Sequence, residues 1–271
     1  MKEKECIRDL RKALSRHAQL GIDKQIDYQK FCLYSIITHS TAIEGSTVTE
    51  IENQLLFDEG TTAKGRTMVE LLMNLDLKAA YEESITLAEK HVPLSVDMLR
   101  GLSALVMKNT GSRYSTLNGD FDPGKGELRK VKVTAGFNGR SYLNFQKVPS
   151  RFETFCKKMN ERYAEALASQ DIIEQYTLSF DAHNLLVAIH PWVDGNGRMS
   201  RLMMNYLQLE FGLVPAKVLR EDRAEYIQAL VDSREQDSPE PFREFMFRTH
   251  LRNITRDIKA FEDSMRDDFD F

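Results

Sequence analysis

Residues 190–201 read HPWVDGNGRMSR, the densest group of polar side chains in the sequence. The stretch lies between two apolar segments whose residue spacing is that of helices. Pro191 has no N–H and disfavours helix for the residue before it, so the incoming helix is expected to end there. Gly195, Asn196 and Gly197 can turn successive backbone N–H groups inward just before the next helix, which makes a nest for an anion.

The other polar side chains of this stretch have the chemistry of a phosphate site. Arg198 and Arg201 share one face of the first turn of the next helix, where cations oppose the helix dipole and so indicate an anionic ligand. Asp194 supplies a carboxylate of the kind that holds Mg²⁺ together with substrate phosphates, and His190 can act as a general base. Together with the nest they predict a nucleoside-triphosphate site with a base facing a phosphoryl group.

Outside this stretch the sequence predicts an all-α protein, because apolar residues recur at spacings of three and four and only 14 Gly and 7 Pro are present. One β-hairpin is expected, since residues 129–133 and 141–145 alternate at period two around the turn pair Asn138-Gly139. Helices are expected at residues 3–18, 24–43, 49–58, 64–90, 95–108, 149–167, 170–189, 197–211, 219–232 and 239–262.

Composition argues for a soluble, cytoplasmic protein. Acidic residues number 41 and basic residues 37, and the net charge of −4 argues against nucleic acid as a partner. Apolar runs fall far short of the ~20 residues that cross a bilayer, and the first residues do not form a signal peptide, so no membrane association is expected. The three cysteines are far apart and odd in number, which favours reduced thiols.

Residues 60–67 (GTTAKGRT) have the glycine spacing of a phosphate-binding Walker A loop, but Arg66 stands where that loop needs lysine. The preceding residues 51–58 have helical spacing and follow a capping box that begins at Thr49, whereas a true P-loop follows a strand. We therefore expect a turn between two helices here.

The stretch at residues 190–201 resembles the motif of Fic-domain proteins, HPFx(D/E)GNGRxxR, at every position except Trp192, which we expect to be a buried wedge. The resemblance extends from about residue 94 to residue 248. Fic domains are helical with one β-hairpin, called the flap, which agrees with the pattern above. It implies an N-terminal helical region at 1–93, a Fic catalytic core at 94–248, and a helix end with an acidic tail at 249–271.

Most Fic enzymes transfer AMP from ATP to a protein hydroxyl. The resemblance implies that His190 deprotonates a Ser, Thr or Tyr hydroxyl of a target protein, which attacks the α-phosphate and releases pyrophosphate. Asp194 would position Mg²⁺, and Arg201 would hold the γ-phosphate. The target would dock along the flap by strand addition, and a homodimer is also expected. The residues implied to bind the nucleotide are Gly195, Asn196, Gly197, Arg198 and Arg201 of the motif, Val133, Thr134, Ala135 and Gly136 of the flap, and Tyr226 and Ile227 beyond it.

Residues 40–45 (STAIEG) resemble the inhibitory signature (S/T)xxxE(G/N) of Fic proteins whose inhibitory helix precedes the core. Gly45 is a good helix stop, which puts Glu44 in the last turn of a helix at about 24–45, where an acid is disfavoured unless a cation pairs with it. By the resemblance that cation is Arg201, with Ser40 as part of the signature, and Glu44 would occupy the place of the γ-phosphate.

Other functions stay open for the same site. Glu44 could orient water for removal of AMP from modified targets, or another nucleotide or phosphoryl group could be transferred. Doc-type toxins transfer phosphate, but they replace the second glycine of the nest, which is retained here as Gly197. A catalytically silent interaction module is disfavoured because His190, Asp194 and both arginines of the motif are intact.

Two groups of residues near the motif receive a structural interpretation. His183 lies seven residues before His190 on the same helix face and is expected to pack in the core. Tyr142 and the basic residues of the hairpin are expected to form a solvated strand face rather than a specific target groove. Those basic residues are Arg129, Lys130, Lys132 and Arg140.

Overall fold

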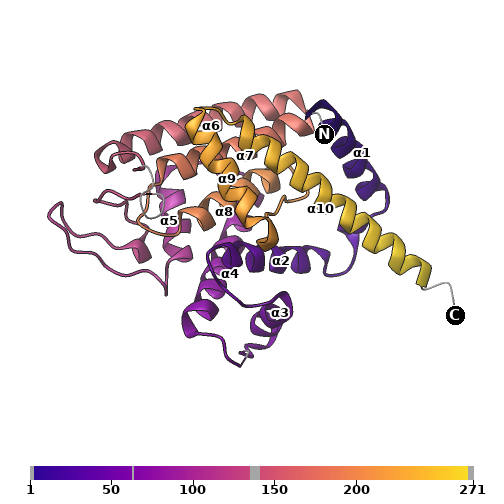
Figure 1. The fold of residues 1–271 in the computed structure, drawn as a ribbon, viewed down its shortest axis with the longest axis horizontal. Helices are drawn as coiled ribbons and strands as arrows, with labels where there is room; N and C mark the ends of the chain where they lie inside the picture. The colour runs from indigo at the N-terminus through magenta and orange to yellow at the C-terminus, as the bar shows by residue number, and fades with distance from the viewer. Residues whose placement is uncertain (1–2, 63, 135–140, 268–271) are drawn as a thin grey trace.

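Apolar residues at helical spacing build ten α-helices in the part of the chain that the computed structural model describes, residues 3–62, 64–134 and 141–267 (Figure 1). The all-α prediction is confirmed, and the ends of the helices differ from the expected ones by at most five residues. The helices are α1 (Glu3–Gln19), α2 (Tyr28–Ile43), α3 (Glu50–Glu59), α4 (Met68–Glu89), α5 (Val96–Val106), α6 (Val148–Ser169), α7 (Ile172–Ile189), α8 (Asn196–Glu210), α9 (Arg223–Glu235) and α10 (Glu240–Asp267).

Helix α8 lies at the centre of the fold and packs against α7 and α4 (Figure 1). The larger core cluster joins α2 and α4–α8 and includes Ile37, Leu77, Leu99, Phe152, Leu178, Trp192 and Met203. In a second cluster, helix α1 packs with helices α7, α9 and α10. This cluster includes Leu10, Tyr176, Phe180, Phe242 and Met246. None of the helices in the described ranges has both the length and the apolar character that a membrane span requires.

The segment between α3 and α4 is a turn, as its sequence predicts. Gly60 ends α3 with a left-handed backbone, φ 67°, and the side chain of Thr67 caps α4 by accepting a hydrogen bond from the N–H of Glu70. This cap makes α4 begin at Met68 rather than at residue 64. Arg66 binds Glu52 of α3 instead of pointing into a phosphate loop.

Helix α2 begins four residues later than expected. A short 3₁₀ turn, Ile22–Lys24, precedes it, and Asp27 has a left-handed backbone with φ 61°, so the chain changes direction before Tyr28. At its other end Glu44 is the C-cap and Gly45 has φ 107°, a backbone conformation that favours glycine. The glycine therefore ends the helix where the sequence predicts and leaves Glu44 at its tip.

Buried amides tie α2 to α3 and α4. Asn74 of α4 accepts hydrogen bonds through its Oδ1 from the Thr41 hydroxyl at 2.7 Å and from Asn53 Nδ2 at 2.8 Å. Asn53 Nδ2 also donates to Thr38 Oγ1 at 2.7 Å, and Asn74 Nδ2 donates to Ser46 Oγ at 3.2 Å. All five side chains are buried, so water cannot replace these hydrogen bonds if α2 moves. The cluster therefore fixes the position of the end of α2.

Replacing Asn74 by alanine is expected to lower the free energy of unfolding by about 2–4 kcal/mol, because it leaves buried hydroxyl and amide groups with fewer partners. Urea unfolding followed by circular dichroism measures the change. Asn118→Ala, in an exposed loop, is the matched control and should change stability by no more than about 0.5 kcal/mol. Equal effects of the two substitutions would contradict the importance of the amide cluster.

The expected β-hairpin is present in the described residues only as an isolated antiparallel bridge between Thr134 and Ser141. Beside it, the N–H of Tyr142 donates to the carbonyl of Val133 at 3.0 Å. Residues 135–140 lie outside the described part of the chain, and the hairpin therefore stays a prediction. The positions concerned include Ala135, Gly136, Asn138, Gly139 and Arg140.

Candidate active site

His190 lies at the end of α7, where Pro191 stops the helix as its sequence predicts. Its backbone is left-handed, with φ 51° and ψ 63°, and its N–H donates to the carbonyl of Leu186 at 3.0 Å. The ring atom Nδ1 lies 3.3 Å from the carbonyl oxygen of Val187, which can only accept. Nδ1 therefore carries the proton in the neutral ring, and Nε2 keeps a lone pair that can accept one.

The environment of His190 keeps its ring neutral at physiological pH. Burial lowers the pKa of His190 to about 4, and the positive charges of Arg129 and Arg234 act in the same direction. The hydrogen bond to the Val187 carbonyl and the charge of Glu44 act in the opposite direction and are outweighed. The ring is thus in the form that a general base requires.

The loop after His190 is held from inside. Trp192 is fully buried, as expected for a wedge, and packs edge-on against Phe152 with ring centroids 5.5 Å apart. The amide of Asn196 pairs with the backbone of Trp192, donating to its carbonyl at 2.8 Å and accepting from its N–H at 3.1 Å. The Asn196 side chain is therefore occupied in shaping the loop, which leaves only its backbone for an anion nest.

The nest already holds a carboxylate. A Cβ placed on Gly197 would lie 2.4 Å from Glu44 Oε1 and 3.1 Å from Arg201 Nη1, so the missing side chain leaves the room that the carboxylate occupies. Gly195 has φ 80°, and a Cβ there would lie 2.8 Å from the sulfur of Met107. Both glycines are thus required by the packing of the nest.

Arg201 binds the inhibitory signature along its length, although Arg201 and Glu44 are 157 residues apart in sequence. Its Nη2 donates to Glu44 Oε1 at 2.6 Å and to the carbonyl of Ser40 at 2.9 Å, and its Nε donates to Ser40 Oγ at 2.8 Å. Arg201 is 3% exposed and the Glu44 side chain is 34% exposed, so the contact is buried on the side of the arginine and partly open to solvent at the carboxylate. The structure brings together Ser40, Glu44 and Arg201 in the arrangement that the resemblance implies.

The electrostatics of the site favour a negative group where Glu44 lies. Burial alone would raise the pKa of Glu44, but the charges of Arg201, Arg198 and Arg223 outweigh it, and the pKa is lowered. The carboxylate is therefore ionised and surrounded by cations. An anionic ligand of similar size would meet the same field.

Arg198 is a buried cation with little compensation from the protein. It is 3% exposed, its Nη1 donates to the carbonyl of Val106 at 3.3 Å, and its Nη2 lies 3.8 Å from Asp194 Oδ2. Its Nε is buried with no hydrogen-bond partner among the described residues. A buried guanidinium whose Nε–H has no partner favours a bound anion beside it.

Tyr226 and Ile227 are adjacent in α9 but point to different places. Tyr226 is buried behind Arg201, whose Nη1 donates to its hydroxyl at 3.2 Å. That hydroxyl also lies 3.0 Å from Nε2 of His183, which is buried in the core as predicted. Tyr226 thus supports Arg201, and its part in binding a nucleotide stays a prediction.

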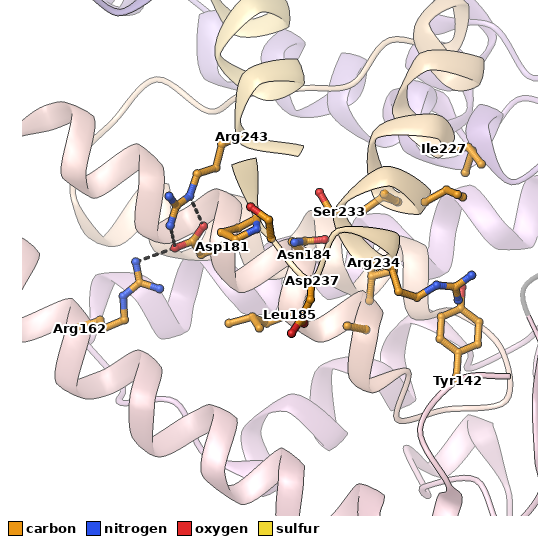
Figure 2. Close-up of a pocket in the computed structure, with 16 residues that line it drawn as sticks. Tyr142, Arg162, Asp181, Asn184, Leu185, Ile227, Ser233, Arg234, Asp237 and Arg243 are labelled. Atoms are coloured by element: carbon orange, nitrogen blue, oxygen red, sulfur yellow. Dashed lines mark hydrogen bonds and ion pairs between the residues drawn. The ribbon is translucent and has the colours of Figure 1, made fainter. Parts of the chain in front are cut away.

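Ile227 lies on the wall of a cavity of about 470 Å³ beside the motif (Figure 2). Leu230 and Val231 add further apolar wall, and Tyr142 and Arg234 stand at one end. At the other end Asp181 accepts hydrogen bonds from Arg162 and Arg243, each with a shortest distance of 2.6–2.7 Å. The lining thus combines an apolar wall with several charged side chains, and its volume is within the range of small-molecule sites.

The expectation of a solvated strand face is wrong for Arg129 and Tyr142. Arg129 is 2% exposed and binds backbone carbonyls, and the Tyr142 ring stacks on the ring of His190 with centroids 3.7 Å apart. Alternation of residue types shows that two faces differ but cannot show which face is covered by a distant helix, and for that reason the pattern did not indicate either contact.

The family model described as the Fic/DOC family matches residues 93–208. "Protein adenylyltransferase fic-1" of Caenorhabditis briggsae is 25% identical over 228 residues, which are 83% of this chain and 41% of that protein. "Protein adenylyltransferase Fic" of Nematostella vectensis is 28% identical over 229 residues, which are 83% of this chain and 48% of that protein. The chain thus spans less than half the length of these curated relatives.

Solved structures with the same fold are also found. A fragment of Fic-1 from C. elegans superposes with a TM-score of 0.74 at 22% identity, over 96% of this chain and 74% of that one. A Fic domain containing signaling protein from Bacteroides thetaiotaomicron superposes with a TM-score of 0.76 at 20% identity, over 94% of this chain and 98% of that one. The likeness therefore includes the N-terminal helices as well as the segment that the family model matches.

Proposed function

Since residues 93–208 of this chain belong to the Fic/DOC family, we propose that the protein is an autoinhibited adenylyltransferase. It transfers AMP from ATP to a Ser, Thr or Tyr hydroxyl of a target protein and releases pyrophosphate. The observation that carries the proposal is the contact of Glu44 with Arg201 over Gly197, because it puts a carboxylate where a phosphate would bind, in reach of a neutral His190.

The phosphates of ATP bind to the cations and backbone at the start of α8. Arg201 takes the γ-phosphate once Glu44 has moved, and Arg198 with its unpartnered Nε takes another phosphate oxygen. Backbone N–H groups at residues 195–197 complete the anion site. Binding of ATP and binding of Glu44 to this position exclude each other, which is the basis of the inhibition.

Asp194 fits the role of a magnesium ligand. Its side chain is 66% exposed beside the nest, with Oδ1 accepting from the N–H of Gly195 at 2.6 Å. A single carboxylate beside the nest is the arrangement in which Mg²⁺ is held mainly by substrate phosphates. Mg²⁺ bound there would neutralise part of the phosphate charge.

His190 activates the attacking hydroxyl. Nε2 takes the proton of the target hydroxyl, whose oxygen forms a bond to the α-phosphorus while the bond to the bridging oxygen of pyrophosphate breaks. The proton remains on the imidazole, which is then a cation next to the phosphates. Bound phosphates carry negative charge and raise the pKa of His190 from its low value, which strengthens the base when the substrate is present.

The nucleoside and the target bind beside the motif. We place the nucleoside against Ile227 in the cavity of Figure 2, and by the resemblance Val133 and Thr134 of the flap would cover it. The target segment adds along the flap as an extended strand.

We also propose that the protein forms a homodimer and is located in the cytoplasm. Sedimentation tests the oligomeric state, and cell fractionation tests the location.

Mass spectrometry of the Glu44→Gly protein tests the function. The purified chain is incubated with Mg²⁺ and ATP, CTP, GTP or UTP, and the added mass identifies both the transferred group and the nucleotide. An AMP adduct on a Ser, Thr or Tyr side chain, from ATP alone, supports adenylyl transfer. A phosphate adduct, or an adduct from another nucleotide, would show that the protein is a transferase of that group and not an adenylyltransferase. The absence of any adduct, both on the chain and on proteins of a cell extract, would reject the proposed function.

A further inference from the structure

The ring of His190 is covered by an aromatic side chain for which the proposed function has no role. The Tyr142 and His190 rings are stacked, with centroids 3.7 Å apart and planes 15° from parallel. The guanidinium carbon of Arg234 lies 5.3 Å from the centroid of the Tyr142 ring, so a cation from α9 holds Tyr142 in turn. Figure 2 shows Tyr142 and Arg234 next to each other at the end of the cavity.

The segment that carries Tyr142 is attached to the backbone of His190 by a buried arginine. Arg129 Nε donates to the carbonyl of His190 at 2.7 Å, and its Nη1 donates to the carbonyl of Val131 at 2.8 Å. Its Nη2 donates to the carbonyl of Leu143, the residue after Tyr142. One guanidinium thus connects the segment at Val131 and the segment at Leu143 to His190, whose backbone is left-handed.

The side chain of His190 needs this support. Within the described residues the one hydrogen bond of its side chain, from Nδ1 to the Val187 carbonyl, is long at 3.3 Å and leaves rotation of the ring weakly restrained. A stacked ring restricts that rotation and excludes water from one face of the imidazole. The hydrogen bond at Nδ1 and the stack on Tyr142 together fix the orientation of the imidazole ring and therefore the direction of the Nε2 lone pair. Proton transfer over hydrogen-bond distance requires such a fixed direction.

We infer that Tyr142 is a positioning residue for His190, with Arg129 holding the two segments in register. The inference rests on the proposed function only for the identity of the reaction. The ring, and not the hydroxyl, carries the effect, because the stack is made by the ring face. The titratable and charged groups facing His190 are Tyr142 and Arg129 beside the flap, Arg234 of α9 and Glu44 at the end of α2.

The experiment compares Tyr142→Phe and Tyr142→Ala in the Glu44→Gly chain, with Tyr114→Ala as the matched control because Tyr114 stacks on Phe121 in the loop at residues 111–126. Tyr142→Phe keeps kcat within about threefold. Tyr142→Ala lowers kcat by about tenfold to a hundredfold, the loss typical of a misplaced catalytic group, and this factor exceeds any rise in the KM for ATP that follows from the place of Tyr142 at the end of the cavity. Tyr114→Ala changes neither.

Titration of the His190 ring by NMR gives a readout that does not depend on activity. Loss of the stack exposes the imidazole, so Tyr142→Ala moves its pKa from about 4 toward 6.5, whereas Tyr142→Phe does not. A pKa that stays in place in both variants, or a Phe variant that loses as much kcat as the Ala variant, would overturn the inference. If the parent Glu44→Gly chain transfers nothing, the proposed function fails, and the NMR titration alone decides the role of Tyr142.

Discussion

His190→Ala, made in a chain that also carries Glu44→Gly, lowers the rate of AMP transfer by about 100- to 10 000-fold, because the target hydroxyl loses the base that takes its proton. The loss falls on kcat. The imidazole is not among the groups that contact the phosphates, whose binding depends on Arg198, Arg201 and the nest. Rapid-quench assays with radiolabelled ATP measure the rate, and calorimetry measures the dissociation constant for ATP.

The control for this prediction is His91→Ala. His91 is an exposed histidine whose Nδ1 lies 2.8 Å from Glu210, away from the motif, so its loss should leave the rate unchanged. A His190→Ala chain that transfers AMP at the parent rate would show that another group is the base. If ATP binding disappears together with transfer, His190 is part of the binding site and the assigned role is wrong.

Glu44→Gly raises AMP transfer, or self-modification, by at least about tenfold in ATP and Mg²⁺. In the wild-type chain the γ-phosphate must replace a carboxylate whose charge-assisted hydrogen bond to Arg201 is 2.6 Å long. Hydrogen bonds to charged groups contribute about 1.5–3 kcal/mol, which corresponds to about 10- to 150-fold in occupancy of the productive ATP position. Autoradiography of the modified protein at matched concentrations measures the ratio.

Two further variants separate charge from shape. Glu44→Gln keeps the size of the side chain and removes its charge, so its rate should lie between those of the wild-type chain and the Glu44→Gly variant. Glu59→Gly, at the exposed end of α3, makes the same residue change away from the site and should leave transfer at the wild-type level. Equal labelling of wild type and the Glu44→Gly variant would reject the inhibitory contact.

The sequence predicts those parts of the protein that depend on neighbours along the chain. The spacing of apolar residues acts locally, as do the proline after His190 and the glycine after Glu44. For that reason the sequence predicts the helices, the end of α7 at His190 and the end of α2 at Glu44. The nest at residues 195–197 is also a local feature, since glycine backbones and a helix start suffice to define it. The motif resemblance supplied the one distant pairing, that of Glu44 with Arg201.

Contacts between distant segments could not be predicted in the same way. In the sequence Arg129 looks like an ordinary surface residue of a strand. It is buried because the end of α7 packs against it and the His190 carbonyl accepts a hydrogen bond from its Nε. Nothing in the sequence around Asn74 distinguishes it from a surface polar residue of a helix, and its burial follows from the packing of α2 and α3 on α4. Tyr226 and Ile227 are adjacent in sequence, yet the first contacts Arg201 and the second lies on the cavity wall, a difference that only the packing of α9 decides.

The separation of 157 residues between Glu44 and Arg201 also has a consequence for biosynthesis. A chain is made from its N-terminus at about 5–20 residues per second, so the glutamate leaves the peptidyl-transferase centre roughly 8–30 s before the arginine does. The inhibitor therefore exists before the site that it blocks. In a newly made molecule Glu44 is already present when α8 is completed, and it can pair with Arg201 as soon as these segments fold.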